Sequence, residues 1–389
     1  MALSGRKLTV IGGGVAGLAV ALACARRGAA VEVLEQAPAI AEVGAGLQIA
    51  PNGARVLRAL GLGEALDRAG MRAAAVELRD GIGGEKVLRM PMPGAPAEGQ
   101  FMLHRADLIA LLLEAARAAG VAVTPRAQVL RVVPGAPQAV LEMADGSRRR
   151  AGLAIGADGL RSVARAALND AEAPFFTGQI AWRAVIEGDG GEPVPQVFMA
   201  PGRHLVSYPL RGGTRRNIAA FEERAEWVAE GWHLTGDAGE FRRRFREFGG
   251  PVPGWLRAVG EVHLWGLFRH EVAARWWGPG CALLGDAAHP TLPFMAQGAN
   301  MALEDGWVLA RCLDEISETD QALAAYQTAR RERVARIVAT AGRNARLYHL
   351  GPPLRAPVHL AMRLGGAVAP GLPLRRFDWI FRHDVTQGG

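Results

Sequence analysis

The pattern of apolar and polar stretches at the start of the chain predicts a strand, a helix and a second strand. The apolar run Leu8–Ile11 is typical of a buried strand. It leads through glycines into the small and apolar residues of 15–27, which predict a closely packed helix. A second apolar run, Val31–Glu35, predicts another buried strand that ends in a carboxylate. Together these stretches predict a βαβ unit.

Weaker patterns continue this arrangement as far as residue 156. The glycine-rich stretch 42–53 predicts a loop, and 71–100 predicts strands broken by Gly and Pro. An amphipathic helix follows, and Gly120 ends it. Its apolar positions, at i, i+3, i+4 and i+7, are Leu108, Leu111, Leu112 and Ala115. Short strands are then predicted at 121–123, 128–133, 139–143 and 153–156.

The pattern changes near Pro174 and changes back about a hundred residues later. From 174 to 275 the chain alternates strand-like runs with polar turns, which predicts a second, mainly antiparallel domain. Cys281–Gly285 repeats the buried-strand pattern, and helices are predicted at 298–314 and 320–348. The first domain is therefore discontinuous. The predicted organisation is an α/β domain over 1–174 and 276–350, an inserted domain over 175–275 and a helical tail over 351–389.

Composition argues against several classes of protein. Half of the 389 residues are apolar, as in a globular chain. The net charge is +7, but all but two of the 45 basic residues are arginines scattered along the chain, so no nucleic-acid partner is expected. The three cysteines are isolated, which argues against a disulfide framework and favours a reducing, cytoplasmic location. No apolar run reaches about 18 residues, so stable membrane insertion is not expected.

Gly12, Gly14 and Gly17 occupy the three positions of a GxGxxG fingerprint. The first glycine permits a tight turn, the second lets the backbone approach a pyrophosphate, and the third lets helix and strand pack closely. The free N–H groups at the start of the helix favour phosphate binding. Glu35 follows Gly17 by 18 positions, near the separation at which a carboxylate binds a ribose hydroxyl. We therefore predict a dinucleotide site; the alternative is a glycine-rich turn in an ordinary βαβ unit.

The stretch Gly285–Pro290, with the sequence Gly-Asp-Ala-Ala-His-Pro, is the second motif. A strand that ends in Gly-Asp places the carboxylate of Asp286 at the carboxyl edge of a parallel sheet, where open α/β folds bind ligands. Gly298 then opens a helix whose backbone N–H groups face the same crevice. The second motif therefore predicts a second side of the same binding site.

These motifs, together with Asp158-Gly159, Ser162 and Arg165, resemble the single-component FAD-dependent aromatic hydroxylases. That group contains 4-hydroxybenzoate, 3-hydroxybenzoate and salicylate hydroxylases and 6-hydroxynicotinate monooxygenase. The resemblance covers nearly the whole chain, including His104–Leu108 and Phe377–Ile380. It implies an α/β (α+β) fold of the 4-hydroxybenzoate hydroxylase type, in which a Rossmann-like FAD-binding domain carries an inserted, mainly antiparallel β substrate domain and C-terminal helices.

The resemblance also implies an activity. The chain is expected to be an NAD(P)H- and O2-dependent FAD monooxygenase that hydroxylates a small phenolic or heteroaromatic acid through a C4a-hydroperoxyflavin. FAD is expected to be non-covalent, with NADH or NADPH as co-substrate. The sequence does not choose between the two nicotinamides, and it leaves a homodimer open as an alternative to a monomer.

Cofactor contacts follow from the resemblance position by position. Asp286 is expected to bind the ribityl chain, Glu35 the adenosine ribose, and Arg105 the region near the pyrophosphate. The backbone of Gly298–Asn300 is expected to lie against the flavin pyrimidine edge, and the loop Gly46–Gln48 to flank the isoalloxazine. The full set of expected cofactor-binding residues is Gly12, Gly14, Val15, Ala16, Gly17, Glu35, Gln36, Gly46, Leu47, Gln48, Arg105, Val129, Asp158, Asp286, Pro290, Gly298, Ala299 and Asn300.

Some motif residues have a purely structural alternative. Asp158 in the family serves both FAD and the nicotinamide donor; alternatively, Asp158 and Arg165 only tie a loop to a helix. His289 lies within the Gly-Asp motif and is expected to be structural rather than catalytic.

His204 and Tyr208 are the predicted catalytic pair. Hydroxylation of a phenol needs an electron-rich ring carbon, so a base or proton relay near the ring hydroxyl is expected. The two positions differ by an even number, so both side chains project from one face of a strand. Hydroxybenzoate and hydroxynicotinate hydroxylases of the group have a His and a Tyr at this spacing. His204 is therefore assigned as base or relay and Tyr208 as a substrate contact; the alternative is a pair of ordinary sheet residues.

The identity of the substrate stays open. Pro293-Phe294 departs from relatives that have Gln or His there, which weakens the transfer of any particular substrate. Arg183, Arg203 and Arg215 are each suited to hold a carboxylate, and the sequence does not choose among them. The rival functions are a ubiquinone-biosynthesis-type hydroxylase of a lipophilic phenol, which the apolar stretch 356–374 favours, and a non-oxygenating flavoprotein reductase or binding protein.

Overall fold

The computed structural model describes most of the chain. The described residues are 2–40, 45–92, 99–170, 173–226 and 234–387. Residues 42–44 of the predicted glycine-rich loop lie outside them.

The predicted βαβ unit at the start of the chain is present. β1 (Lys7–Ile11) pairs in parallel with β2 (Ala30–Leu34), and α1 (Val15–Ala25) connects them. Most residues of α1 are buried, which accounts for the lack of a polar face in its sequence.

The unit forms the centre of a six-stranded sheet. Its order is β19-β20-β12-β1-β2-β8, and all its neighbours are parallel except β19 and β20. The additional strands are β8 (Ala122–Thr124), β12 (Ala154–Gly156), β19 (Trp277–Gly278) and β20 (Cys281–Leu283). A strand from beyond residue 280 thus lies beside strands of the first 160 residues.

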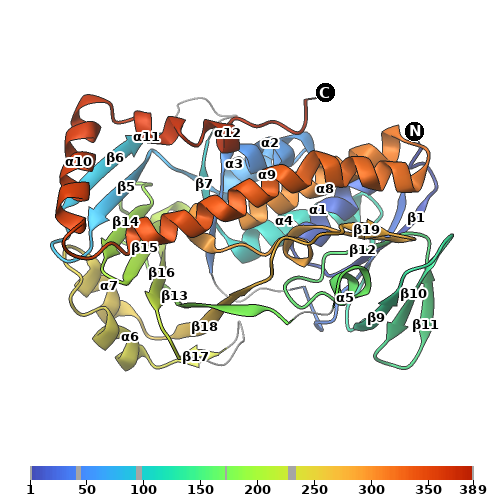
Figure 1. Cartoon of the computed structure of the whole chain (residues 1–389), viewed down its shortest axis with the longest axis horizontal. Helices are drawn as coiled ribbons and strands as arrows, with labels where there is room; N and C mark the ends of the chain where they lie inside the picture. Colours follow the sequence, from blue (N-terminus) through green and yellow to red (C-terminus); the bar gives the residue numbers. More distant parts are fainter. Residues whose placement is uncertain (1, 41–44, 93–98, 171–172, 227–233, 388–389) are drawn as a thin grey trace.

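Helices pack against this sheet and against one another. α1 lies against α4 and α8, and α9 follows α8 and runs across much of the molecule (Figure 1). The helices predicted at 298–314 and 320–348, and the one that Gly120 ends, are confirmed. The helices of this part are α2 (Pro51–Ala59), α3 (Gly63–Ala69), α4 (Arg105–Ala118), α5 (Val163–Leu168), α8 (Gly298–Glu315) and α9 (Thr319–Tyr348).

The prediction that residues 46–48 form a loop is wrong. Gly46–Ile49 is a strand, β3, which pairs with β7 (Phe101–His104), and β7 pairs in turn with β4 (Met71–Arg72). Glycine marked the stretch as a loop, yet at residue 46 it serves close packing. A Cβ there would lie 2.7 Å from the ring of Tyr208, so only glycine lets this strand approach the neighbouring sheet.

The second large sheet has eight strands and is mainly antiparallel. Its order is β17-β18-β13-β16-β15-β14-β5-β6, and the β14–β5 pair is parallel. The strands are β5 (Ala75–Asp80), β6 (Lys86–Pro91), β13 (Phe175–Glu187), β14 (Gln196–Ala200), β15 (Arg203–Leu210), β16 (Arg215–Glu223), β17 (Thr235–Gly236) and β18 (Val262–Arg269). Two of its strands thus come from before residue 100. The division of the chain into domains stays a prediction.

The eight-stranded sheet has two different faces. One carries Ile180, Trp182 and Ala220 and packs on α6 (Ala238–Arg244) and α7 (Val252–Ala258), which bury Phe241 and Leu256 against it. The other face is turned toward β3 and the loop after β20, and it carries the residues discussed below.

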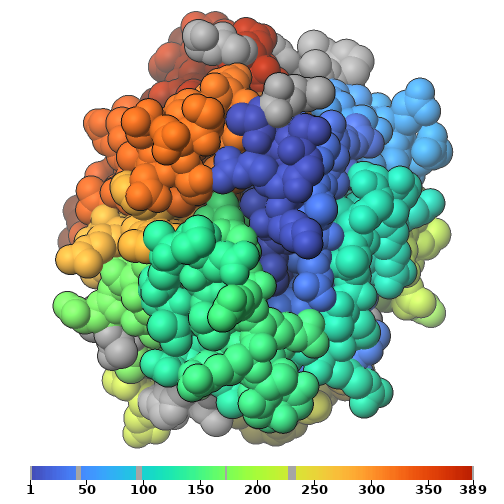
Figure 2. Space-filling view, turned by 90° about the vertical axis from the view of Figure 1, so that its right-hand side faces the viewer, coloured from blue at the N-terminus to red at the C-terminus, as the bar shows by residue number. Residues whose placement is uncertain are grey.

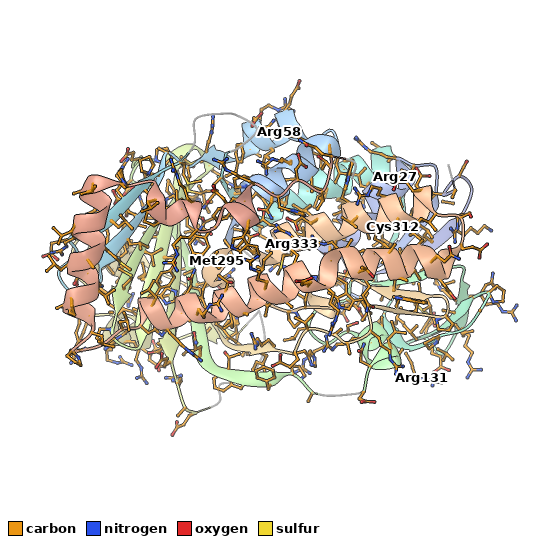
Figure 3. The ribbon with its side chains drawn as sticks, turned by 45° about the horizontal axis from the view of Figure 1, so that its top comes forward. Arg27, Arg58, Arg131, Met295, Cys312 and Arg333 are labelled. Atoms are coloured by element: carbon orange, nitrogen blue, oxygen red, sulfur yellow. The ribbon has the colours of Figure 1, made fainter. Side chains whose placement is uncertain are left out.

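Smaller elements complete the chain. A three-stranded sheet of order β11-β10-β9 covers one end of the molecule beside the N-terminal strand (Figure 2), and Arg131 on β9 pairs there with Glu142 at 2.7 Å (Figure 3). The tail turns back over α2 and β6. No helix among the described residues is long and apolar enough to span a membrane. The remaining elements are β9 (Val129–Val133), β10 (Ala139–Met143), β11 (Arg148–Ala151), α10 (Arg355–Val368), α11 (Leu372–Arg375), α12 (Asp378–Phe381) and three 3-10 turns, Arg211–Gly213, Gly285–Ala287 and Pro293–Met295.

Candidate cofactor and substrate site

A cavity of about 880 Å³ runs from the carboxyl edge of the six-stranded sheet to the eight-stranded sheet. It begins at the glycine turn after β1 and ends at Trp265 and Arg183. Nine of the predicted cofactor residues line it: Gly12, Gly14, Glu35, Gln36, Arg105, Val129, Asp158, Asp286 and Pro290. The two motifs that lie 270 residues apart in the sequence therefore meet at one site.

The glycine turn has the shape that a pyrophosphate requires. A Cβ on Gly12 would lie 2.5 Å from the carbonyl oxygen of Ala157, and one on Gly17 would lie 1.9 Å from that of Gly12. Gly14, in contrast, faces open space and lines the cavity. No side chain caps the first turn of α1, which contains Val15 and Ala16, and no acidic residue lies in it. The backbone N–H groups of this turn are thus suited to hold the phosphates of FAD.

Glu35 occupies the place expected for a ribose-binding carboxylate. It lines the cavity at the end of β2, and its two oxygens accept hydrogen bonds from the N–H groups of Gly13 at 2.7 Å and Ala37 at 2.8 Å. These bonds fix the direction of the carboxylate. Each oxygen has a second lone pair, so the predicted contact to the adenosine ribose is compatible with this geometry.

Asp286 extends into the cavity from the 3-10 turn that follows β20. Burial raises the pKa of its carboxyl, while His289 and Arg105 lower it. Gly285 has a φ of +59° and a Cβ there would lie 2.8 Å from the Cβ of Ala16, so the turn requires glycine. The turn thereby presents Asp286 opposite Arg105, where the predicted roles place the ribityl chain and the pyrophosphate.

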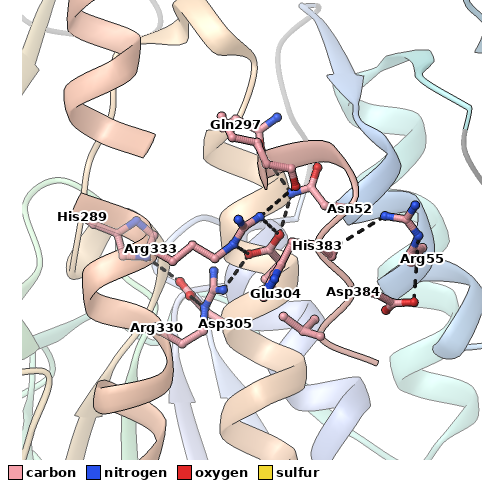
Figure 4. Close-up of polar contacts among 12 residues, drawn as sticks. Asn52, Arg55, His289, Gln297, Glu304, Asp305, Arg330, Arg333, His383 and Asp384 are labelled. Atoms are coloured by element: carbon pink, nitrogen blue, oxygen red, sulfur yellow. Dashed lines mark hydrogen bonds and ion pairs between the residues drawn. The ribbon is translucent and has the colours of Figure 1, made fainter. Parts of the chain in front are cut away.

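A buried cluster of charged residues lies under this turn, and sequence reasoning missed it (Figure 4). Asp305 accepts a hydrogen bond from the N–H of Gly285 at 3.1 Å, lies 2.5 Å from Nε2 of His289 and binds Arg330 at 2.8 Å. Glu304 binds Arg330 at 2.6 Å and Arg333 at 2.8 Å, and it accepts from Asn52 at 2.6 Å. We call the six residues Asn52, His289, Glu304, Asp305, Arg330 and Arg333 the ionic cluster.

The ionic cluster supports the structural role expected for His289. Burial opposes ionisation of Asp305, but His289 and Arg330 outweigh it and lower the pKa of Asp305 to about 2. The carboxylate of Asp305 therefore holds the turn through the N–H of Gly285, and Asp305 itself does not line the cavity. The sequence signal that could have revealed the ionic cluster was the presence of charged residues on the otherwise apolar faces of α8 and α9.

Asp158 makes the contacts of the structural alternative and also borders the cavity. It lines the cavity, and it also accepts hydrogen bonds from Ser162 Oγ at 2.6 Å and the N–H of Val163 at 2.8 Å. Arg165 donates to the carbonyl oxygens of Ala288 at 3.1 Å and Glu271 at 2.8 Å. The loop and helix are therefore tied together as the structural alternative stated, and Asp158 still borders the cavity.

The start of α8 and β3 form one unit beside the cavity. Nδ2 of Asn300 donates to the carbonyl oxygen of Gln48 at 3.2 Å, and its Oδ1 accepts from the N–H of Ala50 at 2.9 Å. These bonds bring together the predicted flavin-flanking residues: Gly46, Leu47, Gln48, Gly298, Ala299 and Asn300. They do not line the large cavity itself, and their contact with the flavin stays a prediction.

The register of the eight-stranded sheet arranges the predicted substrate residues in rows. Across β18, β13, β16 and β15, one row is Trp265, Ala181, Phe221 and His204, the next is His263, Arg183, Ala219 and Val206, and the third, from β13 to β15, is Val185, Asn217 and Tyr208. Ala181 and Ala219 have small side chains and larger side chains surround them, so the middle of this face is a shallow depression, which we call the low centre. The expected shared face of His204 and Tyr208 is present.

The three candidate arginines are separated by this arrangement. Arg183 lines the cavity, and its guanidinium lies 4.9 Å from the ring centre of Trp265. Arg203 belongs to the opposite face and pairs with Glu247 at 3.2 Å, and Arg215 is exposed at the start of β16. Of the three, Arg183 alone is placed to meet a ligand in this cavity.

Tyr208 is held between the sheet and β3. It is 4 % exposed, and the neighbouring Asn217 accepts a hydrogen bond from the N–H of Gly46 at 2.8 Å. Burial raises the pKa of the Tyr208 hydroxyl above its ordinary range, and Arg183 and Gln48 lower it in part. Tyr208 is therefore a neutral hydrogen-bonding group at neutral pH, as a substrate contact requires.

His204 is completely buried beside the cavity and does not line it. Its ring stacks on Phe221 at 4.7 Å and meets the edge of Phe294 at 5.1 Å. Pro293, the sequence neighbour of Phe294, lines the cavity. The departure noted at Pro293-Phe294 thus bears directly on the predicted base.

Several lining residues were missed by the sequence analysis. Arg161 and Thr291 follow motifs that were recognised, so closer attention to motif flanks would have found them. His263 and Trp265 alternate along β18 with the sheet period of two, but nothing in the sequence distinguishes this strand from its neighbours. Their role follows only from the pairing of β18 with β13.

Comparison with known proteins finds a matching family model, related sequences and a similar solved structure. Residues 6–341 match a family model described as an FAD binding domain. The 3-amino-4-hydroxybenzoate 2-monooxygenase of Streptomyces cremeus is 35% identical, over 94% of this chain and 96% of the relative. The 3-hydroxybenzoate 6-hydroxylase of Polaromonas naphthalenivorans is 35% identical over 87% of each. A salicylate hydroxylase solved as a substrate complex superimposes with a TM-score of 0.82 at 26% identity, covering 98% of this chain and 96% of that one.

Proposed function

This chain belongs to the FAD-dependent aromatic hydroxylases, and from that membership we propose that it hydroxylates a phenol that carries a carboxylate. The relatives named above act on 3-amino-4-hydroxybenzoate and 3-hydroxybenzoate, both of which are small hydroxylated aromatic acids. NADH or NADPH is the proposed electron donor and O2 the oxygen source. When bound, FAD supplies the transfer of electrons to O2 and of one oxygen atom to the ring.

The observation that carries the proposal is the shared face of Arg183, Tyr208 and His204. The three residues lie in three adjacent rows around the low centre formed by Ala181 and Ala219. An aromatic ring fits over alanines and is bordered there by one cation, one neutral hydroxyl and one imidazole. In this arrangement Arg183 binds the carboxylate and Tyr208 donates a hydrogen bond to a ring substituent. His204 takes the proton of the phenol, which makes the ring more electron-rich.

The first experiment is a substrate screen with the FAD-loaded enzyme. NADH and NADPH oxidation and O2 uptake are measured with 3-hydroxybenzoate, 3-amino-4-hydroxybenzoate, salicylate, 6-hydroxynicotinate and a long-chain phenol without a carboxylate. We expect an aromatic acid to stimulate both rates and to yield a product heavier by one oxygen atom. Stimulation by the long-chain phenol alone would favour the ubiquinone-biosynthesis-type alternative, and no stimulation by any of them would contradict the proposal.

The second experiment tests the assignment of Arg183 with a matched control. Arg183→Met should weaken binding of the stimulating acid by roughly 10- to 100-fold, because a hydrogen bond to a charged group contributes about 1.5–3 kcal/mol. Arg203→Met changes the same residue type on the opposite face of the sheet and should leave the dissociation constant unchanged. If both variants bind the acid as tightly as the wild type, Arg183 does not bind the carboxylate.

A further inference from the structure

Three polar side chains form an uninterrupted line from the buried face of the sheet to the surface. Nδ1 of His204 lies 2.7 Å from Nε2 of His349, and Nδ1 of His349 lies 2.8 Å from Oε1 of Glu223. The side chain of His204 is fully buried, that of His349 is 3 % exposed, and that of Glu223 is 58 % exposed. We call these three residues the histidine chain.

The order of donors and acceptors in the histidine chain follows from its outer end. A carboxylate accepts hydrogen bonds and donates none, so the Nδ1 of His349 carries a proton and donates to Glu223. Burial lowers the pKa of both imidazoles, most of all that of His204, and both are therefore neutral at neutral pH. The Nε2 of His349 is then an acceptor, and the Nδ1–H of His204 donates to it.

This order leaves Nε2 of His204 as a lone pair, on the side of the ring that has no neighbour to bond. That atom is buried and has no hydrogen-bond partner among the described residues. Phe221, Phe294 and Tyr348 surround the ring, and Val206 on the same face separates it from Tyr208 along β15. Val206 is only partly buried while its sequence neighbours Leu205 and Ser207 are buried, so the low centre of the face opens beside His204.

We propose that the histidine chain is a proton path that carries the phenolic proton of the substrate from His204 through His349 to Glu223 and the solvent. The proposal rests on the proposed function, which makes His204 the acceptor of that proton. His349 and Glu223 touch no substrate and are positioning residues. They set the tautomer of His204 and receive the proton that His204 passes on.

Each transfer in the path breaks one bond to hydrogen and forms another. The phenol O–H bond breaks as a proton joins Nε2 of His204, and the Nδ1–H proton of His204 moves to Nε2 of His349. The Nδ1–H proton of His349 then moves to Glu223, which releases it to water. Both rings end neutral with their protons on the opposite nitrogens, and the substrate is a phenolate. The reverse sequence protonates the phenolate of the product and restores both starting tautomers.

The burial of His204 explains why a path is needed in addition to a base. An imidazolium without water around it is costly, so a proton that remained on His204 would return to the phenolate. Transfer to a carboxylate that is more than half exposed places the charge in water instead. The path therefore leaves both imidazoles neutral, and the phenolate is the one charge that the transfer leaves at the buried face.

The test measures protons and not turnover. Oxidised, FAD-loaded enzyme is mixed with 3-hydroxybenzoate or 3-amino-4-hydroxybenzoate in weak buffer with a pH indicator, and proton release is followed by stopped flow beside the phenolate absorbance. Binding should release up to one proton per site. In His349→Phe the release should slow roughly 100-fold, the lower range for loss of a proton-transfer group. In Glu223→Gln, where the amide accepts a hydrogen bond but takes up no proton, the release should slow by less than in His349→Phe, because water reaches this exposed end of the path.

Controls separate this path from the proposed function and from a structural effect. Glu223→Asp should recover most of the release rate, and Glu332→Gln, an exposed change on α9, should leave it unchanged. If neither phenol binds the wild type, the proposed function fails. If both bind and His349→Phe and Glu223→Gln release protons at the wild-type rate, the path alone is overturned. Loss of release in His263→Gln, with normal release in His349→Phe, would also overturn it, because the proton would then leave through the cavity-lining histidine.

Discussion

The ionic cluster and the histidine chain are both buried polar networks, yet they are built in opposite ways. The ionic cluster consists of full charges, and both oxygens of Glu304 and of Asp305 bind a partner (Figure 4). The histidine chain consists of two neutral rings and one carboxylate; its buried end at Nε2 of His204 lacks a hydrogen-bond partner among the described residues, and its other end at Glu223 reaches the solvent. Within the described part of the chain, Nη1 and Nη2 of Arg330 and Nδ1 of His289 make no hydrogen bond, but every carboxylate of the ionic cluster has a cationic partner, and in this sense the cluster is closed. The histidine chain, which ends at solvent, is open.

The two constructions suit the two networks to different tasks. Charges removed from water are tolerated only when every one of them is paired, and a paired charge has no freedom to move. The ionic cluster therefore fixes the turn that presents Asp286 to the cofactor cavity. Neutral imidazoles cost less to bury and exchange a proton at either nitrogen, so an open chain of them suits transfer. We expect changes in the ionic cluster to affect stability, and changes in the histidine chain to affect proton movement.

Removing one cation from the ionic cluster should have the largest effect. Arg330→Met leaves Glu304 and Asp305 buried with fewer partners, and loss of one member of a buried ion pair costs about 3–5 kcal/mol. The free energy of unfolding of the FAD-loaded protein, measured in urea, should fall by that amount. Arg346→Met, an exposed change on the same helix, should cost no more than about 1 kcal/mol. If the two variants lose the same free energy of unfolding, the ion pairs of Arg330 add nothing to stability beyond what any arginine on α9 contributes.

A smaller loss should follow when one charge of the cluster is removed and the side-chain shape is kept. Glu304→Gln retains an oxygen that accepts from Arg333 or Asn52, but it turns an NH2 group toward a guanidinium. Hydrogen bonds to charged groups contribute about 1.5–3 kcal/mol, so unfolding should become easier by that order. FAD content after purification should fall with it, because α8 carries both Glu304 and the residues that hold β3. A change below about 0.5 kcal/mol would show that charge is not what the cluster requires.

Acid should affect the histidine chain before it affects the ionic cluster. The pKa of His204 is lowered in the folded protein, so the unfolded chain takes up a proton that the folded protein does not as pH falls below about 6.5. Stability should therefore decrease below that pH by at most about 1.4 kcal/mol per pH unit for this group. The pKa of Asp305 is lowered to about 2 in the folded protein. The stability that Asp305 contributes should therefore be lost only as the pH falls below the pKa of an ordinary carboxyl group.

The measurement is the free energy of unfolding between pH 7.5 and pH 5, for the wild type and for His204→Phe. The variant has no imidazole at this position, so its slope should be smaller by up to one proton. Identical slopes would mean that His204 is protonated to the same extent in the folded and unfolded protein, contrary to its burial.

Much of the fold and of the cofactor site could be predicted because local signals coincide there. The fingerprint glycines, Glu35 and Asp286 are each tied to a strand end or a turn, and strand ends of a parallel sheet meet at one edge. β3 could not be predicted, because its pairing with β7, more than fifty residues away, overrides the turn preference of its glycine.

The polar networks could not be predicted because their members are far apart in the sequence. His204 and His349 are separated by 145 residues, and nothing local marks His349 at the end of α9. The pair becomes visible only when α9 crosses the sheet (Figure 1). In the same way, Arg183 can be preferred to Arg203 only when it is known which face of the sheet each residue occupies. For Arg203 that face depends on the register of β15, which the sequence does not show.

The smallest expected effect is that of Glu223→Gln, which is to be measured beside Glu304→Gln. Glu223→Gln makes the same chemical change at the exposed end of the histidine chain, where water replaces much of what the carboxylate provides. Its hydrogen bond to His349 is preserved by the amide oxygen, so the free energy of unfolding should change by less than about 0.5 kcal/mol. Urea unfolding of both variants under one set of conditions measures the contrast. A loss above about 1.5 kcal/mol in Glu223→Gln, the range of a charged hydrogen bond in a protein interior, would make Glu223 a structural anchor like Glu304. The two networks would then differ only in depth, and the reason to treat the open one as a path would disappear.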